Sequence, residues 1–185
     1  MISVDGDIST NDTCLVLANG LAGNRRIVSK GADYKKFAHA LKFLTGELAK
    51  KMARDGEGAT KFIEIEVSGT SNANDAKKIA RKISTSNLLK CCIYGEDPNW
   101  GRVAASCGSA GVEFDPDRVD IYLCGIKALS DGSALKDFDE KKIHKLMQSR
   151  DIKIKVDLKS GRYSAKAWTC DFSKEYVAIN SEYST

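Results

Sequence analysis

The sequence is poor in several features that mark particular classes of protein. Its 185 residues include two prolines and two histidines, and no apolar run approaches the roughly 18 residues that a membrane-spanning helix needs. Lys and Arg together number 29 and Asp and Glu 25, so the net charge is +4, and the basic residues occur as scattered doublets. A nucleic-acid groove needs clustered cations and stacking rings. We therefore expect neither a membrane nor a nucleic acid as a partner.

The cysteines favour a reducing compartment. Six cysteines are present without a Cys-x-x-Cys pair, and residues 1–12 carry three acidic groups and no apolar core, unlike a secretory signal. We expect the cysteines to be buried, reduced and small apolar residues, and the protein to be cytoplasmic. A zinc site would need better spacing and more histidines, so we expect no metal.

Hydrophobic spacing predicts a mixture of helices and strands. The expected helices cover residues 13–22, 33–54, 74–90, 102–110 and 140–148, and the expected strands cover 62–67, 119–124, 152–158, 163–172 and 176–179. Ser160 and Gly161 predict a hairpin turn between two of these strands. The irregular order favours an α+β fold of mixed sheets layered with helices. We expect one domain over residues 1–185, with a candidate lobe boundary near 112–118.

Residues 5–12 are dense in oxygen acceptors. Asp5 and Asp7 are spaced like the start of a calcium loop, but Thr10 and Val16 stand where such a loop needs Gly and Glu. A turn whose side chains cap the following helix is the favoured interpretation.

Residues 55–61 place a carboxylate between two glycines. Gly56 and Gly58 allow a tight turn that exposes Glu57 beside the strand that follows. The loop precedes a strand and is acidic, so it does not suit a phosphate, whereas a carboxylate suits a substrate ammonium. A plain turn remains an equal alternative at this point.

Residues 95–102 combine Asp97, Asn99, Trp100 and Arg102 in one short loop. They could form a binding wall, but a loop tryptophan is more often a packing anchor, so a structural role is favoured. The sequence has no Gly-x-Ser-x-Gly motif, and its two scattered histidines do not assemble a nucleophile with a base. The residues alone therefore indicate three polar loops and no complete catalytic set.

Four of these motifs together resemble a known family. Residues 5–12, 55–61, 97–102 and 176–185 are similar to the β-chain of ornithine acetyltransferase, also called glutamate N-acetyltransferase, of arginine biosynthesis. The resemblance covers essentially the whole chain in order. It implies a partial β-chain with the family's sandwich fold, which resembles that of N-terminal-nucleophile enzymes.

The resemblance implies a precursor that cuts itself into α and β chains. The freed threonine of the β-chain takes the acetyl group from N-acetylornithine and passes it to glutamate, and ornithine leaves; some members also accept acetyl-CoA as donor. The implied partner is the α-chain of the same precursor in a hetero-oligomer. No other cofactor is implied.

The resemblance also assigns site residues. Glu57 matches the acidic substrate-binding residue, and Asn180 and Thr185 match two substrate contacts near the C-terminus. Met1 aligns some tens of residues after the catalytic threonine, so we expect no catalytic residue in this chain and no activity of the chain alone. Thr60 follows Gly58 and Ala59, and this run imitates the self-cleavage site of the family. In the resemblance, however, the run is a motif within the β-chain and not its start.

One departure from the family pattern and two alternative functions stay open. Ile8 stands where the family usually has a threonine. The chain could instead be a non-catalytic module for amino-acid binding or assembly, or a metal-dependent hydrolase that uses Asp5, Asp7 and Asp12.

Overall fold

The computed structural model describes residues 1–182, which fall into two compact units. The larger unit combines Met1–Gly6 with the chain from Ala49 onward, and the smaller unit is Asp7–Leu48. The candidate boundary near residues 112–118 lies inside the larger unit.

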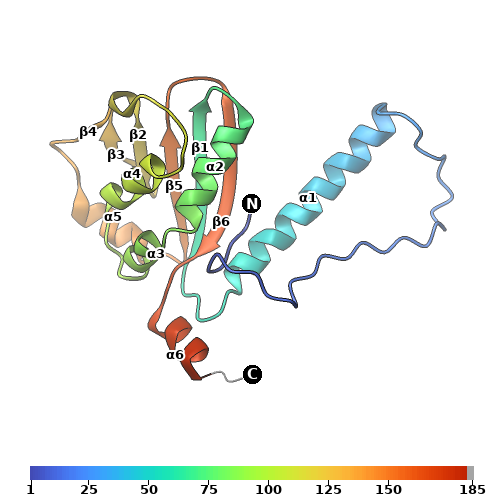
Figure 1. Ribbon diagram of the computed structural model, residues 1–185, viewed down its shortest axis with the longest axis horizontal. Helices are drawn as coiled ribbons and strands as arrows, with labels where there is room; N and C mark the ends of the chain where they lie inside the picture. Colours follow the sequence, from blue (N-terminus) through green and yellow to red (C-terminus); the bar gives the residue numbers. More distant parts are fainter. Residues whose placement is uncertain (183–185) are drawn as a thin grey trace. The chain divides into compact units, whose positions relative to one another are not determined.

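Six strands of the larger unit form one mixed sheet (Figure 1). They are β1 (Phe62–Thr70), β2 (Asp120–Leu123), β3 (Ile126–Ser130), β4 (Ser133–Ala134), β5 (Asp151–Asp157) and β6 (Tyr163–Cys170). Their order across the sheet is β4-β3-β2-β5-β1-β6. β1 pairs in parallel with β5 and antiparallel with β6, so the first strand of the sequence lies between the last two. The expected α+β class is confirmed.

Side-chain caps mark the start of several helices. The helices are α1 (Ala32–Arg54), α2 (Ala73–Ser84), α3 (Asn87–Tyr94), α4 (Trp100–Gly108), the 3-10 helix η1 (Pro116–Arg118), α5 (Glu140–Met147) and α6 (Lys174–Glu182). Asn72 caps α2 and Ser86 caps α3 by accepting hydrogen bonds from main-chain N–H groups. The single helix expected over residues 74–90 is therefore two helices, because Ser86 starts a new one.

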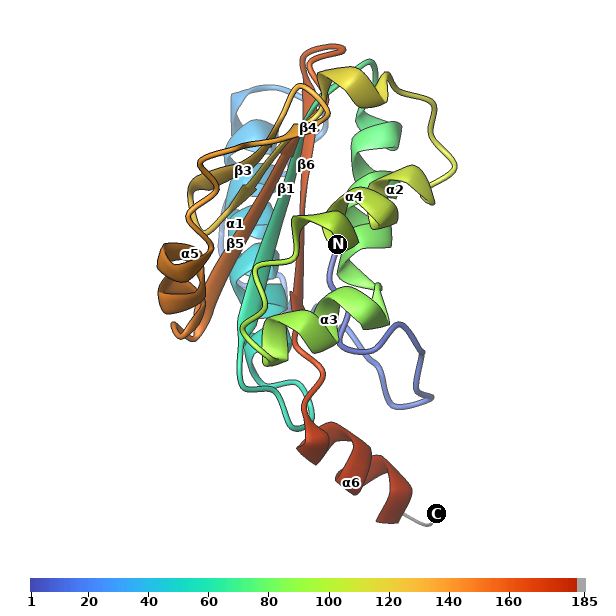
Figure 2. The same cartoon turned by 90° about the vertical axis from the view of Figure 1, so that its left-hand side faces the viewer.

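One face of the sheet is apolar and carries the core. Ile63, Ile65 and Val67 of β1 lie in register with three buried aliphatic residues of β5, and each of the three is fully buried. Helices α2, α3 and α4 cover this face (Figure 2). Fully burying each such side chain contributes about 1.5–3 kcal/mol, so this row strongly favours one strand register.

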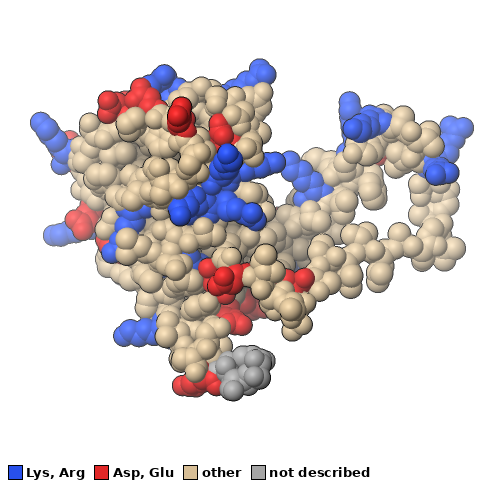
Figure 3. Space-filling model, viewed as in Figure 1, with Lys and Arg blue, Asp and Glu red and all other residues tan. Residues whose placement is uncertain are grey.

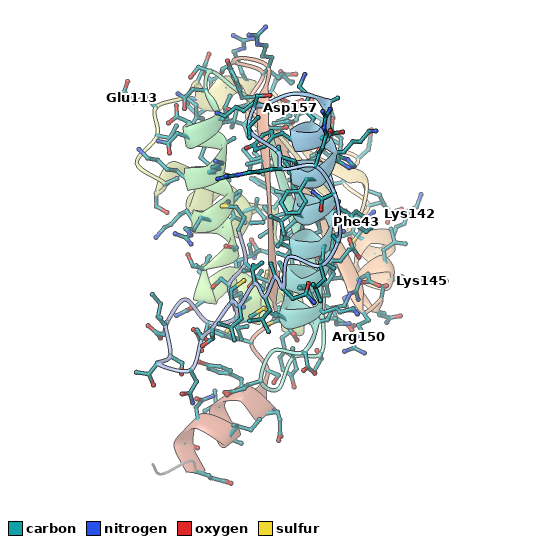
Figure 4. The ribbon with its side chains drawn as sticks, turned by 90° about the vertical axis from the view of Figure 1, so that its right-hand side faces the viewer. Phe43, Glu113, Lys142, Lys145, Arg150 and Asp157 are labelled. Carbon is teal, nitrogen blue, oxygen red and sulfur yellow. The ribbon has the colours of Figure 1, made fainter. Side chains whose placement is uncertain are left out.

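The alternate residues of the same strands are polar, as the spacing predicted. Glu64 accepts hydrogen bonds from Lys166 and from the indole of Trp168, both at 3.0 Å. Helix α5 shows the same division: Ile143 and Met147 are buried, whereas Lys142 and Lys145 point away from the sheet (Figure 4). The central part of β1, β5 and α5 therefore each turn one side toward the core.

Two predictions about the last part of the chain are wrong. Strands β5 and β6 do not form a hairpin, because β1 lies between them. Residues 176–179 are not a strand but belong to α6. The hydroxyl of Ser173 accepts a hydrogen bond from the N–H of Tyr176 at 3.1 Å, which satisfies a main-chain donor at the start of this helix.

One of the two helices expected in the smaller unit is absent. Residues 13–22 contain no helix, and their apolar side chains are exposed, with Leu17 93% accessible. A short apolar segment needs tertiary packing to be helical, and these side chains have little. The helix expected from residue 33 is confirmed as α1.

The cysteine prediction is only partly confirmed. Cys92, Cys107 and Cys170 are buried free thiols, whereas Cys14 and Cys91 are exposed. Burial raises the pKa of Cys107 to about 12. A thiol with so high a pKa is inert as a nucleophile at neutral pH.

Asp120, the first residue of β2, is bonded to three other parts of the chain. It is 4% exposed and accepts hydrogen bonds from Lys159 at 2.6 Å, from Lys127 at 2.8 Å and from the N–H of Asp131 at 2.9 Å. Burial alone would raise the pKa of Asp120, but these hydrogen bonds outweigh it and hold the pKa well below its usual range.

We predict that Asp120→Asn lowers the free energy of unfolding at pH 7 by about 2 kcal/mol, because charge-assisted hydrogen bonds are lost. A carboxylate with a lowered folded-state pKa stabilises the protein above its unfolded pKa of about 3.9, and this stabilisation is lost as the pH falls further. The difference between variant and wild type should therefore shrink below about pH 4 in urea titrations. The exposed Asp137→Asn serves as control, and an equal loss in both variants would contradict the prediction.

Candidate functional site

The pairing of β1 with β6 brings two distant segments together. The strands are antiparallel, and Phe62 at the start of β1 lies opposite Cys170 at the end of β6. Residues 55–61, which precede β1, and the chain that follows β6 therefore meet at one end of the sheet.

Asp171 makes the central contact between these segments. Its carboxylate is 1% exposed and accepts hydrogen bonds from the N–H groups of Thr60 at 2.9 Å and Lys61 at 2.8 Å. The hydroxyl of Thr60 donates to the other carboxylate oxygen. Both the main chain and the side chain of Thr60 are thus bonded to Asp171.

Ser173 makes a second contact with the same loop. Its hydroxyl donates to the carbonyl of Gly58 at 2.6 Å. Gly58 has a positive φ of 61°, and a Cβ atom there would lie 2.5 Å from the nitrogen of Tyr176. Only glycine allows this close approach of the loop to α6.

Glu57 and Asn180 come together as a result. The side-chain amide of Asn180 donates to Oε2 of Glu57 at 2.9 Å and to the carbonyl of Tyr176 at 3.0 Å. Both side chains are exposed, and Figure 3 shows acidic side chains gathered between the sheet and α6. Two of the three residues assigned by resemblance are therefore neighbours, although 123 positions separate them. Thr185 lies outside the described residues.

The first residues of the chain also reach this end of the sheet. Ser3 and Met1 form main-chain hydrogen bonds with Trp168 of β6. Asp5 accepts a hydrogen bond from the hydroxyl of Tyr176 at 3.0 Å, and the ring of Tyr176 stacks on Phe172 with centroids 4.6 Å apart. Asp5 is thus linked to α6.

A buried lysine lies beneath these contacts. Lys90 of α3 is 0% exposed, and its ammonium donates to the carbonyls of Val4 and Cys170 and, at 2.9 Å, to the hydroxyl of Thr169. Burial lowers the pKa of Lys90 from its usual value. Lys90 was not predicted as part of the site, although a lysine within the apolar run of residues 88–93 is a usable signal.

Residues 95–102 act mainly as helix caps and anchors. Glu96 accepts a hydrogen bond from Lys61 at 2.8 Å, and Asn99 accepts one from the N–H of Arg102 at 3.2 Å at the start of α4. The guanidinium of Arg102 donates to the carbonyl of Leu88 at 2.8 Å, and Trp100 packs against the core. These contacts support the structural interpretation of the loop.

The acceptor-rich segment 5–12 forms a local turn. Asp12 accepts a hydrogen bond from the N–H of Ser9 at 3.0 Å, and the hydroxyl of Ser9 accepts one from Asn11 at 3.1 Å. Across residues 1–182, no group of three or more His, Cys, Asp or Glu side chains is arranged to hold a metal ion. The helices in this same range are too short or too polar to cross a membrane.

Comparison with known proteins gives consistent matches along the chain. The model of the ArgJ family matches residues 1–185. The arginine biosynthesis bifunctional protein ArgJ of Symbiobacterium thermophilum is 48% identical over 185 residues, and that of Thermotoga neapolitana is 47% identical over 189 residues. Each match covers 100% of this chain but 46% and 47% of the relative, so the chain spans about half the length of these curated relatives.

A solved structure agrees with the fold. The crystal structure of the arginine biosynthesis bifunctional protein argJ from Bacillus halodurans superimposes with a TM-score of 0.93 at 41% sequence identity. The match covers 98% of this chain and 85% of that chain.

The contacts of Asp171 lead to a stability prediction. Asp171→Asn should lower the free energy of unfolding by about 2–3 kcal/mol. The two main-chain N–H groups lose a charged acceptor, and the NH2 group of the amide faces the hydroxyl that donated to the carboxylate. Asp151→Asn is the matched control: Asp151 pairs with Arg54 at the exposed surface, where an ion pair contributes about 0–1 kcal/mol. Urea denaturation measures the free energy of unfolding of both variants. Equal losses would contradict the prediction, because the buried carboxylate would then contribute no more than the exposed one.

Proposed function

Because the chain belongs to the ArgJ family, we propose that it is the substrate-binding part of a glutamate N-acetyltransferase, which moves an acetyl group from N-acetylornithine to glutamate in arginine biosynthesis. The observation that carries the proposal is the contact between Asn180 and Glu57 at 2.9 Å. Two side chains far apart in the sequence, each assigned to the substrate by family resemblance, converge on one exposed place.

The chemistry of this pair suits an amino acid. The carboxylate of Glu57 accepts hydrogen bonds from an ammonium group with the assistance of charge. The amide of Asn180 can donate to a substrate carboxylate or accept from an ammonium. Thr185 is the third proposed contact, through its hydroxyl. N-acetylornithine, ornithine and glutamate all offer groups of these kinds.

In the proposed reaction the nucleophile is a threonine outside this chain. Its hydroxyl attacks the acetyl carbonyl of N-acetylornithine while its own α-amine takes the hydroxyl proton. The α-amine then passes this proton to the amide nitrogen as the C–N bond breaks, and ornithine leaves as the free amine. The α-amine of glutamate then attacks the acetyl-threonine ester, which forms N-acetylglutamate and restores the hydroxyl. Two successive acyl transfers of this kind give ping-pong kinetics. Neither step needs a cofactor, and acetyl-CoA is an alternative donor.

In this proposal the chain is inactive alone and works with the remainder of the protein. The chain covers 46% of its relative from Symbiobacterium thermophilum, which leaves room for an α-chain and for the catalytic threonine released by self-cleavage. Large exposed apolar side chains in the smaller unit support a companion chain, because soluble proteins rarely leave such surface uncovered. They include Leu15, Val16, Leu17, Leu21, Val28, Phe37 and Phe43. The proposed hetero-oligomer is cytoplasmic.

The proposal predicts activity only in a reconstituted protein. The chain should be expressed together with the part of the Symbiobacterium relative that it does not match, and acetyl transfer from N-acetylornithine to glutamate should be measured. We expect transfer with ping-pong kinetics from the pair and none from the chain alone. Glu57→Gln should raise the KM for N-acetylornithine by about tenfold or more, since a charged hydrogen bond contributes about 1.5–3 kcal/mol.

Glu113→Gln is the matched control, because Glu113 is an exposed acid at the opposite end of the larger unit from α6 (Figure 4), and the proposal does not use it. It should leave the KM within about twofold, as a distant surface charge has little effect. The two halves of the relative, recombined in the same way, give the positive control. If those halves are active but the pair with this chain binds ornithine without turnover, the non-catalytic binding module replaces the acetyltransferase.

A further inference from the structure

The ammonium of Lys90 has an environment that plain packing does not require. A lysine has three donors, and here they go to the carbonyls of Val4 and Cys170 and to the hydroxyl of Thr169. None of these three acceptors carries a charge. A buried cation without a carboxylate in direct contact is costly, so an apolar residue would serve a purely structural role at lower cost.

Lys90 holds the end of β6 from two sides. Its side chain bonds to the carbonyl of Cys170, and its own carbonyl accepts a hydrogen bond from the N–H of Phe172 at 3.3 Å. The ring of Phe172 lies 4.6 Å from the ammonium. Asp171, between these two residues, is therefore fixed in the position from which it holds Thr60 and Lys61.

The contacts of Lys90 also belong to a closed series of interactions that includes α6. The ammonium holds Val4, and the next residue, Asp5, accepts the hydroxyl of Tyr176. Tyr176 stacks on Phe172, whose ring faces the ammonium again. The carbonyl of Tyr176 accepts from Asn180, one turn further along α6. The orientation of α6 is thus determined by contacts that begin and end at Lys90.

We propose that Lys90 is a positioning residue for the Glu57–Asn180 pair: it fixes the strand end and the N-terminal segment that orient the Glu57 loop and α6 toward each other. Lys90 touches neither Glu57 nor Asn180 in this arrangement and acts through Asp171, Phe172 and Val4. The substrate-binding part of this inference rests on the proposed function, whereas the coupling of Lys90 to the pair can be tested without substrate.

The first test is amide hydrogen exchange of the full chain carrying Lys90→Met. Methionine keeps most of the side-chain length but has no donor. The amides of Thr60, Lys61 and Tyr176 should exchange at least about tenfold faster, because their ordering contacts are released, while the centres of β2 and β5 keep their protection.

Two further variants separate positioning from general loss of stability. Ile121→Ala truncates a buried side chain on β2, which β5 separates from β1. This variant should speed amide exchange in β2. The amides of Tyr176 and Thr60 should exchange as slowly as in the wild type. Thr169→Val removes a single acceptor of Lys90 and should give a smaller increase with the same pattern, even if Lys90→Met does not fold.

The second test uses the reconstituted pair described above. Loss of positioning should raise the KM for N-acetylornithine at least about fivefold with kcat within about twofold, because the site is disordered before substrate binds. A merely structural loss would lower the active fraction, and thus the apparent kcat, at unchanged KM. Lys90→Arg, which restores the charge and donors, should recover part of the KM.

The inference is overturned if Lys90→Met and Thr169→Val raise exchange evenly over the sheet, as a global loss of stability would, or if both leave Tyr176 and Thr60 protected. An unchanged KM in an active reconstituted enzyme would overturn it as well. If wild-type pairs show no transfer and no ornithine binding, the proposed function fails, and the exchange pattern still decides whether Lys90 orders the pair.

Discussion

The antiparallel pairing of β1 with β6 is the constraint on which the proposed site depends. It sets the start of one strand against the end of the other, so that Asp171 lies within hydrogen-bond distance of Thr60 and Lys61. A slip of one residue would turn the apolar residues of β1 to the polar face of the sheet. The core therefore enforces the register, and the register places the Glu57 loop beside α6.

Local patterns in the sequence were sufficient for the strands but not for their neighbours. The alternation in residues 152–158 and the turn at Ser160 and Gly161 suggested a hairpin, yet this turn carries the chain past the end of β1. A Cβ atom on Gly161 would lie 2.2 Å from the carbonyl oxygen of Thr70, which explains the glycine without a hairpin. Phe62 of β1 lies opposite Asp151 of β5, a partner 89 positions away, and a local sequence pattern carries no information about so distant a partner.

The site shows the same limit. Tyr176, Val177 and Ile179 have side chains that favour strands, but the hydroxyl of Ser173 and the stacking of Tyr176 on Phe172 four residues earlier stabilise a helix instead. The family motifs identified Glu57 and Asn180 without indicating that they touch. Asp171 and Lys90, which bring them together, act through contacts between segments far apart in the sequence and were not predicted.

In the proposed function, the exposure of Glu57 assigns different tasks to this chain and to its proposed companion. An ion pair at about 4 Å in water contributes only about 1 kcal/mol, whereas a dissociation constant of 1 mM requires about 4 kcal/mol. The pair of Glu57 and Asn180 therefore cannot retain an amino acid strongly while it faces solvent. A companion that covered it would exclude water and strengthen the same charge interaction several-fold. In the proposed function the contribution of this chain is therefore geometric. It orders a carboxylate and an amide before the substrate binds, so that binding does not have to supply the entropy cost of ordering these two side chains.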